Sequence, residues 1–258
     1  MKKYLEEFHK LKVFGKQEAT DITKDANTAK DLLRRYKQEG FLSQVRRNLY
    51  VATDLVTKSS IATPFEIGSQ VTPSANIAYH SALEYHGLSN QQFYEVYVSS
   101  KERFNDFDYE GLHYRCCESR LSAGILNPTG TSLIKVTDLE RTVVDCLDYI
   151  DRAGGVEELV ACLTLITYLK EDKLLEYLAG YGKQVLYQKT GFILSYFQTE
   201  MQLSDVFFSI CKDKTGKSTR YLTDAAESTT FFKEWNLYAP ADILSSIKQG
   251  TTDYAELY

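Results

Sequence analysis

Apolar residues in the first 50 positions recur with helical spacing and then give way to two short runs. Residues 2–10 and 16–22 predict short amphipathic helices, and a stronger helical pattern follows them. The stronger pattern places apolar side chains at i, i+3, i+4 and i+7: Ala29, Leu32, Leu33 and Tyr36. Gly40 should end this helix, because glycine readily adopts the left-handed conformation found just past a helix C-terminus. Apolar runs at 41–42 and 49–51 flank the polar SQVRRN and predict a hairpin, which completes the element order of a winged helix-turn-helix.

The next stretch of chain predicts a connector, a helix and a small sheet. Residues 53–75 contain Ser/Thr-rich patches and two prolines, which indicate a connector. Residues 74–88 predict a helix with Ser74 as its N-cap and Gly87 as its end. Apolar and polar residues alternate at 94–100, 112–117 and 132–137, as expected for half-buried strands.

From Asp138 onward the periodicity is mainly helical. Helices are expected at 138–152, 156–169, 171–180, 183–199 and 203–212. The tail, 213–258, has weak periodicity and predicts a mixture of helix and coil. The sequence therefore predicts an α+β protein with a winged helix-turn-helix domain at 1–52 and a connector at 53–75. The remaining domain, 76–258, would contain a small sheet at about 94–137, a mainly helical body at 138–212 and the mixed tail.

Composition and charge change this picture in one respect. The 258 residues are 43% hydrophobic and 25% charged, which excludes a collagen-like or wholly disordered chain. The net charge of −5 argues against a nucleic-acid binder. However, residues 1–50 carry twelve Lys/Arg and seven Asp/Glu, and the other residues carry 18 and 28. A surplus of five positive charges on an N-terminal segment indicates an anionic partner for that segment.

Cysteine usage and hydropathy predict a cytoplasmic protein. The five cysteines include an adjacent pair and no CxxC, which fits neither a disulfide framework nor a zinc site. The N-terminus has charges throughout and lacks the apolar run of a signal peptide. The least polar stretch, 159–169, is too short to cross a bilayer. We expect no membrane association, no metal and no cofactor.

The expected helix that stops at Gly40 would present a polar face to solvent opposite its apolar face. Asn, Gln, Lys and Arg read base edges and phosphates in a major groove, so this face is a candidate DNA-binding surface. The hairpin tip adds residues suited to phosphates or to the adjacent minor groove. The candidate DNA-binding residues are Asn27, Thr28, Lys30, Arg34, Gln38, Arg46, Arg47 and Asn48.

A second constellation lies on the expected helix at 138–152. Asp138, Glu140 and Asp145 suggest a metal-dependent nuclease or a nucleotide-handling enzyme. The competing interpretation is structural, because Arg141 pairs with Asp145 and Arg152 with Asp148 at i,i+4, as on a solvated helix face. Asp138 also stands where an N-cap belongs. The four histidines form no ligand motif, and no catalytic residue is assigned.

Several segments together resemble the AbiEi family of abortive-infection antitoxins. Residues 16–54 resemble its winged-helix N-terminus, which has the wing pattern Gly-x-Leu-x-x-x-x-Arg-x-x-Tyr. IAYHSALEYHGL, 77–88, is similar to the family's aromatic-x-Ser-Ala-Leu-x-x-His-Gly-Leu helix. VTDLERTVVDCLD, 136–148, is similar to its Asp-x-Glu-Arg-Thr-x-x-Asp block, and LYQKTGFILSYF, 186–197, matches a later helix more weakly. The matched positions of the wing are Gly40, Leu42, Arg47 and Tyr50.

The resemblance implies the antitoxin of a type IV toxin–antitoxin system. Its N-terminal domain would bind inverted repeats of double-stranded DNA in its own promoter and repress transcription, with two protomers on one operator. Its C-terminal domain would neutralise a nucleotidyltransferase-like toxin without a stable complex. The candidates for the antitoxic function are Ser81, His86, Asp138, Glu140, Arg141 and Asp145. The alternatives are the metal-dependent enzyme and a regulator whose helical body binds a small molecule.

Overall fold

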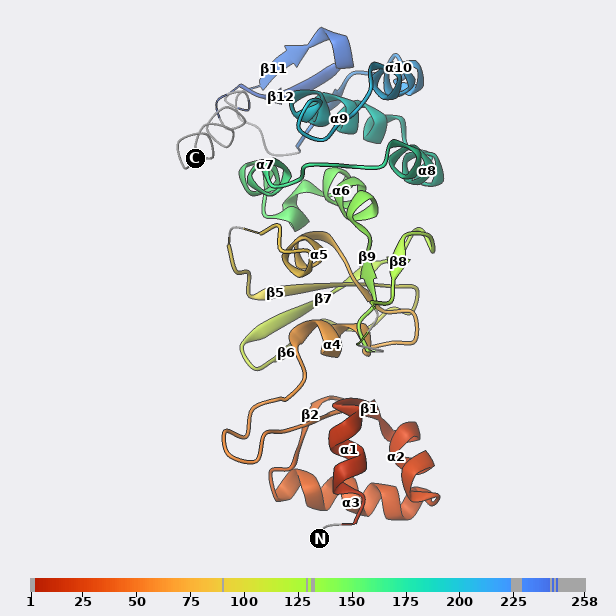
Figure 1. Cartoon of the computed structure of the whole chain (residues 1–258), viewed down its shortest axis with the longest axis vertical. Coiled ribbons are helices and arrows are strands. Elements are labelled where there is room, and N and C mark those ends of the chain that lie inside the picture. Colours follow the sequence, from red (N-terminus) through yellow and green to blue (C-terminus); the bar gives the residue numbers. More distant parts are fainter. Residues whose placement is uncertain are drawn as a thin grey trace. The chain divides into compact units, whose positions relative to one another are not determined.

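The computed structural model describes residues 3–89, 91–128, 130, 133–223, 229–241, 243 and 245. The protein is a mixed α/β structure of helices and small sheets (Figure 1). Its contacts divide it into two compact units. The first comprises Met1–Ile77, Phe93–Ser119 and Leu126–Val136, and the second comprises Ala78–Gln92, Arg120–Ile125 and Thr137–Tyr258. The predicted division at 52 and 75 stays a prediction.

The first unit begins with a head, which we define as residues 3–52. Its elements are α1 (Leu5–Leu11), β1 (Val13–Gly15), α2 (Lys16–Thr23), α3 (Ala26–Gln38), β2 (Leu42–Arg46) and β3 (Leu49–Ala52). The three strands form an antiparallel sheet in the order β1-β3-β2. Phe8, Phe14, Leu33 and Tyr36 are buried in the core that the helices share with this sheet. The three helices lie where the periodicity predicts them, whereas β1 has too few residues to show an alternation.

Two residues fix the ends of α3. The Asp25 carboxylate accepts a hydrogen bond from the Thr28 backbone N–H at 2.7 Å, which caps the helix N-terminus. Gly40 has a φ of +70° just past the C-terminus, as expected, and Phe41 N–H donates back to Tyr36 O at 2.9 Å. The cap lowers the pKa of Asp25 below its ordinary value, because backbone N–H groups stabilise the carboxylate.

The predicted connector contains a helix, α4 (Pro64–Ser69). Pro64 occupies the first helical turn, where its missing N–H costs nothing, and Thr63 and Glu66 form a reciprocal capping box. Glu66 is buried and also accepts a hydrogen bond from Lys12 Nζ at 2.8 Å. The connector predicted at 53–75 therefore contains a short helix that begins at its proline, and its role as a connector stays a prediction.

The main sheet has six strands in the order β6-β7-β5-β4-β9-β8. These strands are β4 (Asn76–Ile77), β5 (Glu95–Ser100), β6 (Phe107–Tyr109), β7 (Leu112–Glu118), β8 (Ile125–Leu126) and β9 (Val136–Thr137). The strands predicted at 94–100 and 112–117 are confirmed. The strand predicted at 132–137 is shortened to β9, and residues 131 and 132 lie outside the described residues. Ser74 is not an N-cap, because β4 pairs with β5 and the helix begins only after it.

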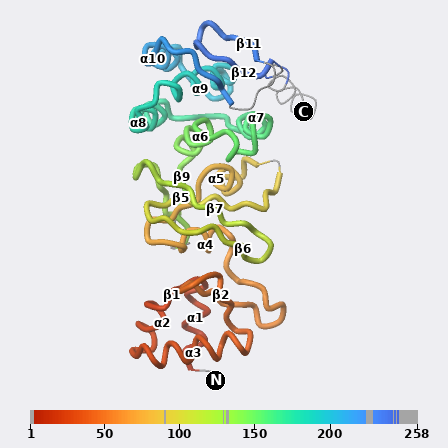
Figure 2. The backbone as a smooth tube through the Cα atoms, turned by 180° about the vertical axis from the view of Figure 1, so that it is seen from behind, coloured from red at the N-terminus to blue at the C-terminus, as the bar shows by residue number. Residues whose placement is uncertain are grey.

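The second unit contains the helices that the periodicity predicts (Figure 2). They are α5 (Tyr79–Tyr85), α6 (Leu139–Asp148), η1 (Ile150–Ala153), α7 (Val156–Thr164), α8 (Glu171–Tyr181), α9 (Gln184–Leu194), η2 (Ser195–Phe197) and α10 (Asp205–Lys214). Asp138 caps α6, as predicted: its Oδ1 accepts a hydrogen bond from Arg141 N–H at 2.9 Å. None of the described helices is long and apolar enough to cross a bilayer.

The tail forms a second small sheet where helix and coil were predicted. It contains β10 (Arg220–Tyr221), β11 (Thr229–Phe232), η3 (Lys233–Trp235) and β12 (Leu237–Pro240), with the strand order β10-β12-β11. The prediction was wrong here because strands this short leave little periodicity in the sequence. The tail positions 224–228, 242, 244 and 246–258 lie outside the described residues.

Gly191 lies directly against the ring of Trp235. A Cβ atom at this position would lie 2.0 Å from Cζ3 of Trp235, whose ring is buried. Gly191→Ala should therefore lower the free energy of unfolding by about 1–3 kcal/mol, the usual cost of overpacking a core. Trp235 is the single tryptophan, so its fluorescence in a denaturant titration reports both the unfolding and any displacement of the ring. An unchanged unfolding midpoint would contradict this packing.

Candidate nucleic-acid interface

Helix α3 exposes the polar face that its sequence pattern predicts. Asn27, Lys30, Arg34 and Gln38 are all exposed, and the Arg34 side chain is 73% exposed. The other face is buried, because Leu32, Leu33 and Tyr36 belong to the head core. The high amphipathicity of α3 thus leaves its cationic residues directed at solvent. Thr28 is exposed as well, with its backbone N–H held by the cap.

A concavity of about 320 Å³ lies against this face. Its cationic lining joins Lys30 and Arg34 with two residues that sequence reasoning missed, Lys16 and Lys37. Lys16 is the first residue of α2, and Lys37 lies one turn beyond Arg34 and donates to Gln44 Oε1 at 2.9 Å. The charge surplus of the N-terminal segment signalled both lysines, but their placement beside Arg34 depends on the packing of α2 on α3. One acid, Asp31, also lines this concavity and lies 3.8 Å from Arg34 Nη2, which leaves a surplus of three positive charges that suits phosphates.

The hairpin gives different surroundings to the two arginines that were predicted to act together, although both line one concavity. Arg47 and Asn48 form the exposed turn between β2 and β3, and Asn48 has a φ of +67°. Arg46 is half-buried, with its guanidinium carbon 5.3 Å from the ring centroids of Phe104 and Phe107. Arg46 Nη1 is buried and has no hydrogen-bond partner among the described residues. Arg47 and Asn48 are therefore exposed at the turn, whereas the Arg46 guanidinium packs on two aromatic rings, and DNA binding by all three stays a prediction.

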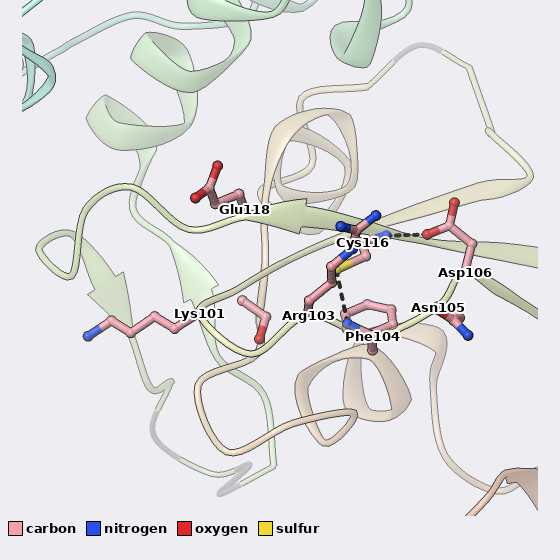
Figure 3. Close-up of a pocket in the computed structure, with 8 residues that line it drawn as sticks. Lys101, Arg103, Phe104, Asn105, Asp106, Cys116 and Glu118 are labelled. Atoms are coloured by element: carbon pink, nitrogen blue, oxygen red, sulfur yellow. Dashed lines mark hydrogen bonds between the residues drawn. The ribbon is translucent and has the colours of Figure 1, made fainter.

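Phe104 also lines a concavity of about 670 Å³ in the sheet region (Figure 3). The lining contains charges of both signs: the basic residues Lys101 and Arg103 and the acidic residues Asp106 and Glu118. The Asp106 carboxylate is already engaged, because its Oδ1 accepts the Cys116 backbone N–H at 2.8 Å. This mixed lining favours no single class of ligand.

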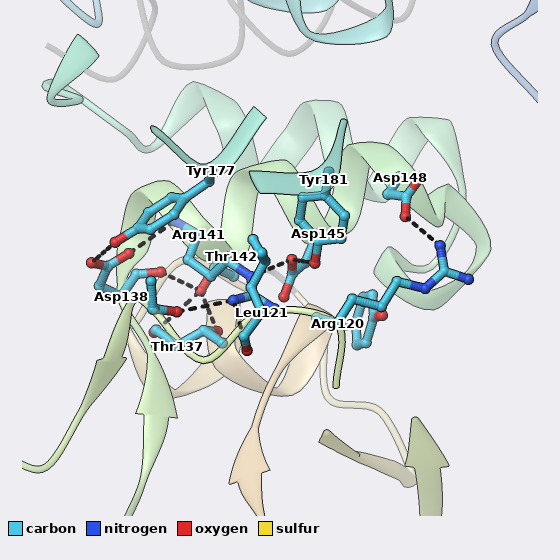
Figure 4. Close-up of polar contacts among 12 residues, drawn as sticks. Arg120, Leu121, Thr137, Asp138, Arg141, Thr142, Asp145, Asp148, Tyr177 and Tyr181 are labelled. Atoms are coloured by element: carbon cyan, nitrogen blue, oxygen red, sulfur yellow. Dashed lines mark hydrogen bonds and ion pairs between the residues drawn. The ribbon is translucent and has the colours of Figure 1, made fainter. Parts of the chain in front are cut away.

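The second constellation, around α6, is buried. Tyr177 and Tyr181 of α8 point toward Asp138 and Asp145 of the α6 segment (Figure 4). Asp138 Oδ2 accepts hydrogen bonds from Lys173 Nζ at 2.6 Å and Tyr177 OH at 2.7 Å. Each carboxylate oxygen of Asp138 is thus occupied by a donor from its own unit.

Arg141 and Asp145 form a buried ion pair, and each side chain is only 2% exposed. Arg141 Nε donates to Asp145 Oδ1 at 2.6 Å, and Tyr181 OH donates to the same oxygen. Arg141 Nη1 donates to the carbonyl oxygens of Ala123 at 2.9 Å and Leu121 at 3.3 Å. Burial raises the pKa of the Asp145 carboxyl, and the adjacent guanidinium offsets part of this shift.

The i,i+4 pair of Arg141 and Asp145 was thus correctly predicted, but its assignment to a solvated face was wrong. Helix α8 covers it, and Asp148 at the helix end is held by Lys183 Nζ at 2.6 Å. The carboxylates proposed as metal ligands also do not converge: Glu140 Oε1 accepts the Lys170 backbone N–H at 3.0 Å. In the described parts of the chain, the one group with metal-ligand geometry is a different set, His80, Glu158 and Cys162.

The remaining antitoxin candidates are also integrated into the fold. Ser81 is fully buried in α5, and His86 Nε2 lies 2.8 Å from Thr137 O. The sequence motifs therefore place their polar residues inside the second unit. His86 is only half-buried, and the antitoxic role of these residues stays a prediction.

The comparisons with known proteins identify a shared fold. No family model matches the sequence, and no curated protein matches it. The structure is similar to the crystal structure of the RV2827C protein from Mycobacterium tuberculosis, with a TM-score of 0.64 and 13% sequence identity. The similarity covers 92% of this chain and 88% of that chain. At this identity the similarity shows that the two proteins share a mixed α/β fold over nearly their whole lengths.

Proposed function

We propose that the protein is a DNA-binding transcriptional repressor and the antitoxin of a type IV toxin–antitoxin system. The observation that carries the DNA-binding part is the exposed polar face of α3, whose cations line one concavity with Lys16 and Lys37. In this proposal the head acts as a winged helix-turn-helix, with α3 as its recognition helix and the β2–β3 turn as its wing. Asn27, Lys30 and Arg34 enter the major groove, and Arg47 contacts phosphates beside it.

The charge distribution supports this assignment. Each DNA phosphate that is neutralised by Lys or Arg releases counterions. A protein surface with clustered cations therefore has the highest affinity for DNA. The head collects them, and the residues beyond position 50 carry ten more acidic than basic side chains. The acidic remainder keeps DNA contact confined to the head. Two protomers then bind the two halves of an inverted repeat in the promoter of the protein's own operon.

The antitoxin part of the proposal rests on the resemblance of 77–88 and 136–148 to the AbiEi family. It assigns the second unit to the neutralisation of a nucleotidyltransferase-like toxin without a stable complex. The buried positions of Asp138, Arg141 and Asp145 support a structural role for these motif residues. In this proposal, exposed residues of the second unit carry out the neutralisation, and the buried residues of α6 stabilise the fold that presents them.

Fluorescence anisotropy with double-stranded DNA from upstream of the gene tests the DNA-binding part. We expect Arg47→Ala to weaken binding and to lower the slope of log K against log salt by about 0.9, the value for one phosphate contact. Arg220→Ala is the matched control, because it removes an exposed arginine outside the head and should leave both quantities unchanged. Arg46→Ala should leave the slope unchanged, since its guanidinium lies against two aromatic rings.

Absence of binding to this DNA, or equal binding to a shuffled sequence, would contradict the repressor assignment. A slope that falls with Arg46→Ala and not with Arg47→Ala would overturn the assignment of the wing. For the antitoxin part, cells that express a neighbouring nucleotidyltransferase-like gene should stop growing, and co-expression of this protein should restore their growth. An isolated gene, with DNA binding that responds to a small molecule, would instead favour a metabolic regulator.

A further inference from the structure

Three potential metal ligands converge in the interior of the second unit. His80 lies on α5, and Glu158 and Cys162 lie four residues apart on α7. Residues spaced i,i+4 share one face of a helix, so both α7 side chains are directed at the same point of α5. His80 and Cys162 are fully buried, and Glu158 is 6% exposed. One ligand atom from each residue lies within 4.8 Å of the other two.

Two of the three separations are close to those of ligands around one small ion, and the third is at most 4.8 Å. His80 Nε2 lies 3.2 Å from Glu158 Oε1, and Cys162 Sγ lies 3.4 Å from the same oxygen. Ser89 Oγ, from the segment after α5, lies 3.2 Å from His80 Nε2. Tetrahedral zinc, with bonds of about 2.0 Å to nitrogen or oxygen and 2.3 Å to sulfur, spaces its ligands by roughly 3.3–3.7 Å. Small shifts therefore convert the hydrogen-bonded set into a coordination shell.

The chemistry of the set selects the ion. Imidazole, carboxylate and thiolate together match zinc, whereas calcium and magnesium prefer oxygen ligands alone. Glu158 and a deprotonated Cys162 supply two negative charges, which balance a divalent ion in a buried site. Without an ion, a carboxylate in the interior depends on hydrogen bonds from its neighbours, which is a costly arrangement.

We propose that His80 Nε2, Glu158 and Cys162 Sγ bind one zinc ion, with the Ser89 hydroxyl nearest to the fourth position. Binding transfers the thiol proton of Cys162 to solvent, and the proton of the imidazole resides on Nδ1. The ion ties α5 to α7 within the second unit and has a structural role. Sequence spacing gave no sign of it, because His80 and Glu158 are 78 residues apart.

Metal analysis of the full chain tests this site. After dialysis against chelator and reloading with zinc, we expect one zinc per chain by mass spectrometry of the metal. Reloading with Co²⁺ should give a thiolate-to-cobalt charge-transfer band. Cys162→Ser is the informative variant, because its hydroxyl still donates to Glu158 while being a poor zinc ligand. It should lose the band and bind zinc at least tenfold more weakly, with the metal-free melting temperature nearly unchanged.

Cys146→Ser is the matched control, since Cys146 is also fully buried in a helix of the same unit and is outside the ligand set. It should keep the cobalt band whatever its effect on stability. Zinc should raise the melting temperature of wild type and of Cys146→Ser but not of Cys162→Ser. A wild-type chain that retains no zinc, or a cobalt band that survives Cys162→Ser, would overturn the proposal and leave a hydrogen-bonded cluster.

Discussion

Asp145→Ala should lower the free energy of unfolding by about 3–5 kcal/mol, the cost of leaving a buried charge without its partner. The variant removes the acceptor of Arg141 Nε and of Tyr181 OH while the guanidinium stays enclosed by α8. Urea unfolding followed by circular dichroism measures this loss. The effect should be among the largest for any single substitution in the chain, because both side chains of the pair are only 2% exposed.

A surface ion pair of similar length provides the control. Lys212 Nζ and Glu234 Oε1 lie 2.5 Å apart, but their side chains are 42% and 66% exposed. Water and salt screen such a pair, so Glu234→Ala should cost less than about 1 kcal/mol. The contrast between the two variants tests the effect of burial, since the N–O distances of the two pairs are 2.6 and 2.5 Å.

The double variant Arg141→Met/Asp145→Leu separates the charge from the space that it fills. It removes both charges together. Its loss of unfolding free energy should therefore be smaller than the sum of the losses for Arg141→Met alone and Asp145→Leu alone. It still forfeits the hydrogen bonds to Leu121 O and Ala123 O, and some destabilisation therefore remains. Strict additivity, or a loss below about 1 kcal/mol for Asp145→Ala, would contradict a buried pair.

The same variants bear on the role of the motif residues. If Asp145 acts only by holding α6 and α8 together, neutralisation should fall in proportion to the folded fraction. A stable Asp145→Ala chain that binds DNA but no longer neutralises the toxin would instead assign Asp145 a direct antitoxic role. Measuring stability beside growth rescue distinguishes the two.

The periodic spacing of apolar residues correctly predicted the amphipathic helices and their buried faces. The stripe of Leu32, Leu33 and Tyr36 correctly gave α3 and its exposed face, because one buried face is enough to fix an amphipathic helix. The helices of the second unit followed from the same signal. Strands of two to four residues, such as β1, β8 and β10, escaped it, because pairing with neighbours stabilises them more than their own alternation does.

For the site residues, the sequence pattern does not predict which side chains are buried. An Arg and an Asp at i,i+4 have the same pattern on a solvated helix and on a covered one, so only the packing of α8 distinguishes them. Arg46 and Arg47 are adjacent in sequence, yet the pleat of β2 directs one at aromatic rings and leaves the other at the turn. Long-range packing is the information that the sequence pattern lacks at both places.

Removing the cations of the head concavity should abolish repression and spare neutralisation. In Lys16→Gln/Lys30→Gln/Arg34→Gln/Lys37→Gln, four exposed charges are lost from one surface. A slope of about 0.9 per phosphate contact corresponds to roughly fivefold in affinity per contact at 0.15 M salt, so the four should together cost about 10²–10³-fold. Anisotropy measures this loss on promoter DNA, and a promoter-fused reporter measures derepression.

Four other exposed lysines supply a control with the same change in net charge. Lys170, Lys214, Lys217 and Lys233, all in the second unit, are replaced by glutamine together. If binding depended on overall charge, this variant would lose affinity equally; if it depends on the head, affinity and salt slope should stay near wild type. Toxin neutralisation should survive in the head variant, because its substitutions lie outside the second unit. Loss of neutralisation in a head variant of unchanged melting temperature would contradict the division of labour between the two units.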